Sequence, residues 1–279
     1  MDQNLQRFRD AVAPERVSIN LCEAALLCAQ DAYPQLDIAD SMRRIDALAE
    51  TLRRRLPPDF STAHRLLALN NYLFRELGFS GDTDNYYDPR NSFLNEVLVR
   101  KTGIPITLSI LYIEIGERLG LKLRGVSFPG HFLVKIRVAG GELVLDPYDS
   151  GRSLSEEDLR ERLARFTGEQ AAQTLPLEDL LESASPRQIL ARLLRNLKAI
   201  YLEAKDLDRA LAVMNRLVVL LPNVPEERRD RGLAYIQMEC PRAAADDLGH
   251  YASQRPGAED AEKVAAQLAA ATINAARLN

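Results

Sequence analysis

The sequence is poor in the residues that build disulfide frameworks and structural metal sites. Its 279 residues include three cysteines and three histidines. Three cysteines cannot all pair, and Cys22, Cys28 and Cys240 form no CxxC motif and no Cys/His cluster, so we expect neither disulfides nor a bound metal. A sparse, odd number of cysteines is typical of proteins in a reducing compartment.

A long apolar run is also missing. The best N-terminal apolar stretch, residues 19–29, is interrupted by Glu23, and no stretch approaches the roughly 18 apolar residues of a membrane span. The first ten residues carry alternating charges and no apolar segment of the kind found in secretory signals. We therefore expect a cytoplasmic protein that does not associate with membranes.

Neither sign of charge dominates the sequence. The 36 lysines and arginines are balanced by 40 aspartates and glutamates, for a net charge of −4. This balance and the lack of a DNA-reading motif argue against direct nucleic-acid binding. The 46% hydrophobic and 27% charged residues are ordinary for a globular protein, and the length suffices for about two domains.

Apolar periodicity predicts a series of helices in the first part of the chain. Helical spacing predicts helices over residues 17–32, 38–56, 62–77, 95–100 and 105–120, the last apolar nearly all round and therefore buried. A polar, aromatic loop at 79–93 separates the third helix from the fourth, and loops of this length are often functional.

The pattern changes after residue 120. Alternating residues with Pro-Gly and Gly-Gly punctuation predict a strand, a turn and a β-hairpin around Gly140 and Gly141. A helix start follows at Ser155, where acidic residues cluster. We expect the stretch 169–186 to link two domains.

The last hundred residues contain an internal repeat. Matching residues recur at an offset of 34 in the pairs Tyr201/Tyr235, Ala210/Ala244 and Pro222/Pro256. This is the tetratricopeptide period, with an aromatic residue in the first helix, a small residue early in the second and a closing proline. Gly232 has Lys198 as its counterpart, so the first copy departs from the pattern. A last helix from Glu259 to Leu278 would cap the array; the alternative is a generic helical bundle.

One histidine differs from the other two. His64 and His250 fall in predicted helices, whereas His131 follows a Pro-Gly turn and begins a strand. Asp146 ends the partner strand, and alternation with period two places both side chains on one face. A carboxylate beside a histidine orients the imidazole and raises its basicity. The pair is therefore either part of a functional site or a structural hydrogen bond.

Several long motifs together resemble one known family. GIPITLSILYIEIGERLG, GVSFPGHFLVKI and LVLDPYDSG resemble the transglutaminase-like core of the bacterial SirB family, as does NYYDPRNSFLNEVLVRKTGIP. The resemblance spans roughly residues 40–279. It implies an α+β, papain/transglutaminase-like core of helices packed on a small antiparallel sheet, followed by an all-α tetratricopeptide-like repeat domain. We expect the core with its N-terminal helices at 1–170 and the repeats with the capping helix at 186–279.

The resemblance also implies a catalytic triad, which is incomplete here. In the superfamily a Cys begins a helix, a His lies on the next strand and an Asp on the one after. His131 takes the His place and Asp146 the Asp place, but Pro105 stands at the nucleophile position and has no attacking group. Thr107 and Ser109 follow on the same helix; Ser109, one turn deeper, is the candidate substitute nucleophile. Their hydroxyls could equally bond backbone carbonyls.

Cys22 and Cys28 fall outside the core motif, and we expect both to be buried apolar side chains. Whether either approaches the cleft from its N-terminal helix stays open.

Polar residues of the long loop are candidates for a binding cleft around His131. They are Asn85, Asp88, Arg90, Asn91 and Asn95, with Tyr148 from the hairpin end. Such a cleft would hold a peptide segment or a small polar ligand without turning it over. The alternative is structural: His131 and Asp146 hold the hairpin against the helix.

Two functions follow from this organisation. The first is a non-catalytic cytoplasmic adaptor or regulator that binds a protein or peptide partner through its repeats. The second is a hydrolase or acyltransferase that uses His131 and Asp146 with Ser109, Thr107 or an activated water as nucleophile. The enzyme would need a hydroxyl beside His131 and an open cleft. Neither reading implies a cofactor, and the sequence names neither a partner nor an oligomeric state.

Overall fold

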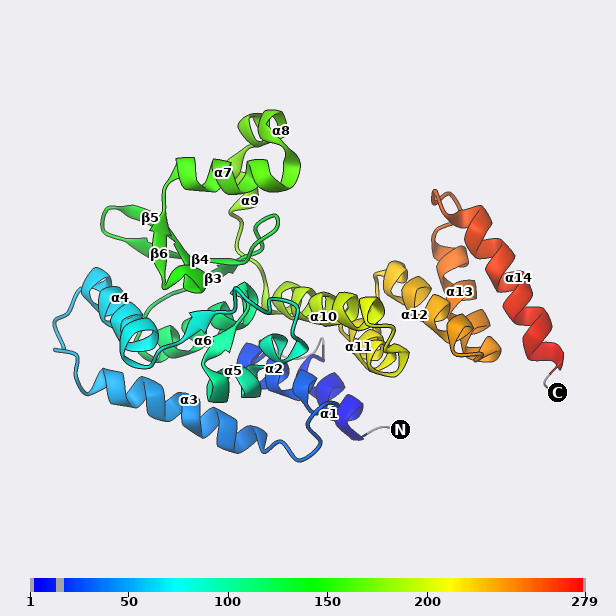
Figure 1. Ribbon diagram of the computed structural model, residues 1–279, viewed down its shortest axis with the longest axis horizontal. Helices are drawn as coiled ribbons and strands as arrows, with labels where there is room; N and C mark the ends of the chain where they lie inside the picture. The colour runs from blue at the N-terminus through cyan, green and yellow to red at the C-terminus, as the bar shows by residue number, and fades with distance from the viewer. Residues whose placement is uncertain (1–2, 14–17, 278–279) are drawn as a thin grey trace. The chain divides into compact units, whose positions relative to one another are not determined.

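The computed structural model describes residues 3–13 and 18–277 (Figure 1). The chain forms two compact units, one from Glu15 to Leu193 and one that combines the N-terminal helix with the segment from Leu194 onward. None of the helices in the described ranges is long and apolar enough to cross a membrane.

The core unit begins with a set of helices. They are α2 (Leu21–Ala29), α3 (Ile38–Arg53), α4 (Thr62–Asn70), the π-helix η1 (Asn71–Glu76), α5 (Leu94–Arg100) and α6 (Pro105–Arg118). The predicted helix over 62–77 is therefore α-helical in its first half and a π-helix in its second. The polar loop after it contains the 3-10 helix η2 (Pro89–Ser92), and short β1 (Ser80–Gly81) pairs in parallel with β2 (Thr102–Gly103), which the sequence did not predict.

Helix α6 is the central buried helix of this unit. Eleven of its 14 residues are buried, as its all-round apolar pattern predicted. It packs against α2, α3 and α5 and against strands β3 and β4. Each fully buried leucine or isoleucine contributes about 1.5–3 kcal/mol of apolar transfer free energy, so α6 is held firmly in place.

A four-stranded antiparallel sheet packs on α6. It has the order β3 (Arg124–Val126), β4 (Leu133–Val138), β5 (Gly141–Asp146), β6 (Arg152–Leu154). Val138 pairs with Gly141 across the β4–β5 turn, so the predicted hairpin is confirmed; β6 is an additional strand. The 3-10 helix η3 (Pro147–Asp149) joins β5 to β6.

Helices also cover the other face of the sheet. These are α7 (Glu156–Thr167), α8 (Glu169–Thr174) and α9 (Leu177–Leu180), which lie above the strands in Figure 1. Ala172 and Leu177 share a buried cluster with Phe128 and Leu133. The stretch 169–186 is therefore not the linker that we expected, because its apolar side chains complete the core of the sheet.

The second unit is all-helical. It contains α1 (Gln3–Ala11), α10 (Pro186–Glu203, of which the unit takes the part from Leu194), α11 (Leu207–Leu220), α12 (Pro225–Gln237), α13 (Pro241–Gln254) and α14 (Ala261–Arg277). From α11 onward each helix packs against the next. The small repeat residues Ala210 and Ala244 are fully buried. A Cβ at Gly232 would lie 2.9 Å from the Leu248 side chain, so the close packing of α12 on α13 requires glycine there.

Helix α1 belongs to this repeat unit. It packs against α11, Phe8 is fully buried, and the Arg216 guanidinium lies 5.2 Å from the centre of the Phe8 ring. The sequence analysis grouped all N-terminal helices with the core at 1–170. The structure differs for this helix because its packing partner, α11, lies about 200 residues further along the chain, a contact that no local pattern signals.

Candidate functional site

His131 and Asp146 meet at one end of the β4–β5 hairpin. His131 lies two residues before β4, in a turn closed by a hydrogen bond from its backbone N–H to the Phe128 carbonyl of 3.2 Å. Asp146 is the last residue of β5. Their side chains are joined by a 2.9 Å hydrogen bond between His131 Nε2 and Asp146 Oδ1. The His131 side chain is 16% exposed and that of Asp146 is not exposed at all, so only the histidine reaches solvent.

The Asp146 carboxylate has two further partners. Its Oδ1 accepts a 3.0 Å hydrogen bond from the Tyr148 backbone N–H, and its Oδ2 lies 2.7 Å from Arg162 Nη2 of α7. Burial would raise the pKa of Asp146, but the hydrogen bond and charge of His131, the charge of Arg162 and the Tyr148 N–H together lower it below its ordinary value. Asp146 is therefore ionised at neutral pH. Nε2 of His131 donates to it, which leaves Nδ1 for a ligand or a proton.

The start of α6, where the resemblance places the nucleophile, is apolar. Pro105 is the first residue of the helix and is buried. The Thr107 hydroxyl donates a 2.8 Å hydrogen bond to the Asn91 carbonyl and is fully buried. Ser109 is also fully buried, and its Oγ has no hydrogen-bond partner among the described residues. Neither hydroxyl is open to a ligand.

The cysteines supply no substitute nucleophile in the core. Cys22 and Cys28 are buried in α2, as expected, and burial raises the pKa of Cys22 well above the ordinary value of a thiol. Cys240 is exposed but belongs to the repeat unit. Within the described ranges, the side-chain hydrogen bond of His131 goes to Asp146 and not to a hydroxyl or thiol.

Tyr148 connects the histidine to the polar loop. Its ring meets His131 edge to face, with ring centres 5.8 Å apart, and its hydroxyl donates a 2.7 Å hydrogen bond to the Asp82 carbonyl. A Cβ at Gly81 would collide with the Tyr148 ring, so β1 needs glycine at this close approach. The sequence analysis placed Tyr148 beside His131, and the structure brings the two together.

Most polar side chains of the loop bond to the loop itself. Asn91 is fully buried and donates 2.9 Å hydrogen bonds to Asp82 Oδ2 and to the Asn85 carbonyl. The pKa of the Asp82 carboxyl is lowered, although partial burial opposes the shift. The causes are hydrogen bonds from the Asn85 N–H and the Asn91 amide and the positive charge of Arg100. Asn91 is thus a scaffold for the loop rather than the wall of a cleft.

The remaining predicted cleft residues are only partly available. Asp88 and Arg90 pair with each other at 2.6 Å, and Asp88 also caps η2 by accepting a 2.9 Å hydrogen bond from the Arg90 N–H. The Asn85 side chain is exposed, whereas Asn95 is half-buried on α5. Asp82, Arg100 and Arg162 could not be identified from the sequence, because charged residues in loops and on helix faces carry no local sign of a distant partner.

No metal site is found in the part of the chain that the structure describes, where no three His, Cys, Asp or Glu side chains converge. The His131–Asp146 pair itself can orient and polarise a ligand or a water molecule through Nδ1.

The match to known families covers most of the chain, from residue 39 to residue 269. Residues 39–195 match the transglutaminase-like superfamily, and residues 197–269 match the tetratricopeptide repeat family. A crystal structure of menin aligns over 98% of this chain and 68% of that one, with a TM-score of 0.43 and 10% identity; a likeness this weak carries no argument.

Three bacterial relatives are similar along most of their length. A UPF0162 protein of Xylella fastidiosa strain Temecula1 is 42% identical over 251 residues, 90% of this chain and 89% of the relative. The UPF0162 protein YchA of Escherichia coli K12 is 30% identical, and Protein SirB1 of Salmonella typhimurium is 29% identical, each over 89% of this chain and 91% of the relative. The chain therefore belongs to the UPF0162 (SirB) family and combines a transglutaminase-like domain with tetratricopeptide repeats.

Proposed function

We propose that this protein is a non-catalytic transglutaminase-like protein that acts in the cytoplasm as an interaction or regulatory adaptor through its repeats. One observation supports the proposal: Pro105, to which the resemblance assigns the position of the superfamily's attacking cysteine, is buried at the start of α6 and has no nucleophilic atom. Without a nucleophile, the His131–Asp146 pair cannot form an acyl intermediate.

The neighbouring hydroxyls do not replace the missing thiol. A serine or threonine nucleophile needs a base within about 2.6–3.2 Å and access to the substrate. The Thr107 hydroxyl is committed to the Asn91 carbonyl, and both Thr107 and Ser109 are fully buried. Attack by either would require α6 to leave its packed position.

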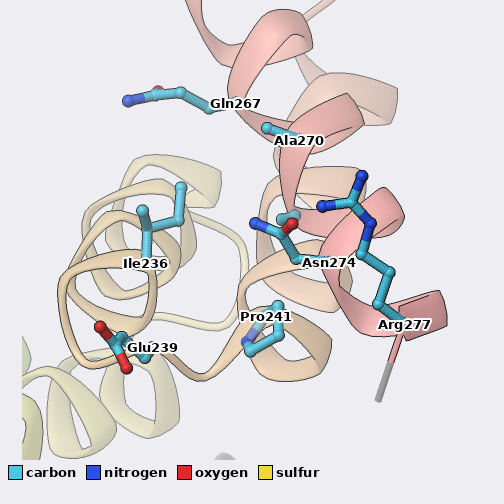
Figure 2. A pocket seen from close by; sticks show the side chains of 8 residues that line it. Ile236, Glu239, Pro241, Gln267, Ala270, Asn274 and Arg277 are labelled. Carbon is cyan, nitrogen blue, oxygen red and sulfur yellow. The ribbon is translucent and has the colours of Figure 1, made fainter. Parts of the chain in front are cut away.

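The repeats offer a surface for a partner. A cavity of about 490 Å³ opens between the end of α12, the start of α13 and one side of α14. In Figure 2, Ile236 lies below Gln267 and across the cavity from Asn274 of α14. Pro241 lies between Glu239 and Arg277, and the Glu239 carboxylate points away from α14. An apolar floor with a polar rim suits a peptide or helix of a partner.

A covalent-chemistry assay tests the non-catalytic part. Wild type and His131→Ala would be incubated with a glutamine-containing peptide and a primary amine, and with simple amide and ester substrates. Mass spectrometry should detect neither amine incorporation nor hydrolysis above the buffer rate for either protein. Turnover by wild type that disappears in a folded His131→Ala variant would overturn the proposal.

Site-specific crosslinking tests the adaptor part. A photoreactive benzoylphenylalanine would replace Ile236 or Ile273, whose side chains are 36% and 54% exposed on the repeat unit. The matched controls replace Leu67 and Val99, which are 63% and 66% exposed on the core unit. In cells we expect a discrete crosslinked protein from the repeat positions and not from the controls. Identical patterns at all four positions would contradict a repeat-borne partner.

The intact His131–Asp146 hydrogen bond favours one second candidate, a hydrolase in which His131 activates a water molecule. Nδ1 is the nitrogen left for that proton, and an ionised Asp146 would stabilise the imidazolium that forms. The hydrolysis arm of the same assay decides between the two, because a water nucleophile needs no residue at position 105.

A further inference from the structure

A cavity of about 530 Å³ lies directly beside the His131 turn. Its walls come from the turn (Phe128, Pro129 and Gly130), from Phe166 of α7, from Leu180 of α9 and from Arg192 of α10. All of these residues belong to the core unit. The sequence marked Pro129 and Gly130 only as the turn before His131 and did not single out Phe166, Leu180 or Arg192. None of the lining residues takes part in the His131–Asp146 pair.

Arg192 is anchored to the same carbonyl as His131. Its Nη1 donates 2.8 Å and 2.9 Å hydrogen bonds to Ser127 Oγ and to the Phe128 carbonyl. That carbonyl also accepts the 3.2 Å hydrogen bond from the His131 N–H. The guanidinium is thus held at a fixed place, one turn away from the histidine.

The positive charge of Arg192 has an aromatic neighbour, the Phe132 ring, whose centre lies 5.7 Å from the guanidinium carbon, but no carboxylate partner among the described residues. In residues 3–13 and 18–277 no carboxylate forms an ion pair with it, unlike Arg162 or Arg195, and its Nε and Nη2 make no hydrogen bond to a described residue. Desolvation by burial lowers the pKa of Arg192, and Tyr86 acts in the opposite direction. A fixed, half-buried guanidinium with free donors is the group that proteins use to bind a planar carboxylate.

The rest of the cavity has an apolar wall and an acidic rim. Phe166 is 66% exposed although it is a large aromatic residue, and it packs over Gly130, where a Cβ would lie 2.9 Å from its ring. Leu180 continues this wall. Asp179 and Glu182 also line the cavity but are exposed and do not pair with Arg192. The cavity therefore presents a cation, an apolar surface and two anions to one ligand.

We propose that this cavity binds the C-terminal end of a partner polypeptide. The terminal carboxylate pairs with Arg192, an apolar last side chain packs on Phe166 and Leu180, and basic residues upstream face Asp179 and Glu182. The charge pattern selects this occupant: a simple anion leaves the wall and the acidic rim unused, and an apolar compound leaves Arg192 unpaired. This site goes beyond the repeat surface and does not depend on whether the repeats hold a partner.

Peptide binding to the full chain tests the proposal without any mutation. The probe is an eight-residue peptide with an N-terminal fluorophore, two lysines in its middle and a C-terminal leucine, compared with the same peptide as a C-terminal amide. Fluorescence anisotropy should show saturable binding of the free acid and an affinity lower by about tenfold or more for the amide. Equal affinities, or no binding of the free acid at millimolar protein, would overturn the proposal.

Two sets of variants then locate the peptide. Arg192→Gln should reduce affinity for the free acid to that of the amide, while Arg165→Gln, whose side chain is 80% exposed on α7, should leave it unchanged. The double variant Asp179→Asn, Glu182→Gln should have a lower affinity for the lysine-containing peptide. Its affinity for a version with alanines in place of the lysines should be unchanged. The control is Glu178→Gln, an exposed neighbour on α9. Unchanged binding in Arg192→Gln, or full competition by acetate or inorganic phosphate at equal concentration, would contradict a peptide C-terminus as the ligand.

Discussion

Replacing Asp146 with asparagine removes the charge on which three segments of the core converge. The carboxylate receives His131 from the turn before β4, the Tyr148 N–H from η3 and Arg162 from α7. The asparagine side chain could still accept the first two hydrogen bonds through its carbonyl oxygen. Its NH₂ group, however, would face the guanidinium of Arg162, and two donors cannot bond.

The magnitude follows from the burial of this group. Asp146 is fully buried, and removing one partner of a buried ion pair costs about 3–5 kcal/mol because the other charge is left uncompensated. His131→Ala removes one hydrogen bond to a charged acceptor, worth about 1.5–3 kcal/mol, and leaves Arg162 paired. Asp146→Asn should therefore destabilise the core more than His131→Ala does.

Native-state hydrogen exchange measures this effect where it occurs. The chain has two compact units, so a single free energy of unfolding for the whole chain is not well defined. Peptides from β4 and β5 should report a loss of about 3–5 kcal/mol in the free energy of opening in Asp146→Asn. Peptides from α12 and α13 should be unchanged and serve as the internal control. A loss below about 1 kcal/mol in β4 and β5 would refute the reasoning, because an ion pair of little net value would then be indicated.

Three further predictions rest on other parts of the structure. The pKa of Asp146 is lower in the folded state than in the unfolded chain. The contribution of this group to stability is therefore present above about pH 4 and disappears as the pH falls through the folded pKa. Acid titration of wild type should show this loss of stability, and Asp146→Asn should lack it. Gly232→Ala adds a Cβ 2.9 Å from the Leu248 side chain of α13, and hydrogen exchange should show that the free energy of opening of the repeats falls by about 1–3 kcal/mol. Gly257→Ala, whose Cβ would have no atom within 4 Å, should leave this free energy unchanged. Cys240 should react with iodoacetamide in the native protein, while Cys22, buried and with a raised pKa, should react only on unfolding; equal rates would contradict the packing of α2.

Features with a local signal could be predicted from the sequence. The hairpin follows from period-two alternation and a Gly-Gly turn. The sequence also paired His131 with Asp146, and the two share a 2.9 Å hydrogen bond. His131 lies in the turn before β4, however, and not at the start of a strand as the alternation argument assumed. The burial of α6 follows from its all-round apolar surface. The repeat helices follow from the 34-residue offset, which reflects packing between neighbouring helices.

Features that depend on distant partners could not be predicted. Arg162 and Arg192 are ordinary surface residues by their local pattern, and only the fold brings one to Asp146 and the other to the His131 turn. The sequence makes Asn91 a candidate for the binding cleft, because polar residues in a long loop are often functional, and leaves a structural role open. Its amide bonds instead to Asp82 and holds the loop in shape, and a residue type alone does not separate these two roles.

The most direct test of the central claim is the intact mass of the wild-type protein after exposure to an activated acyl ester. The account predicts that any acyl adducts lie on exposed amines or on Cys240 and are the same in wild type and His131→Ala, because Pro105 offers no nucleophile and Thr107 and Ser109 are buried. A stoichiometric adduct on the core unit that is absent in a folded His131→Ala variant would contradict it and establish the chain as a covalent acyl-transfer enzyme.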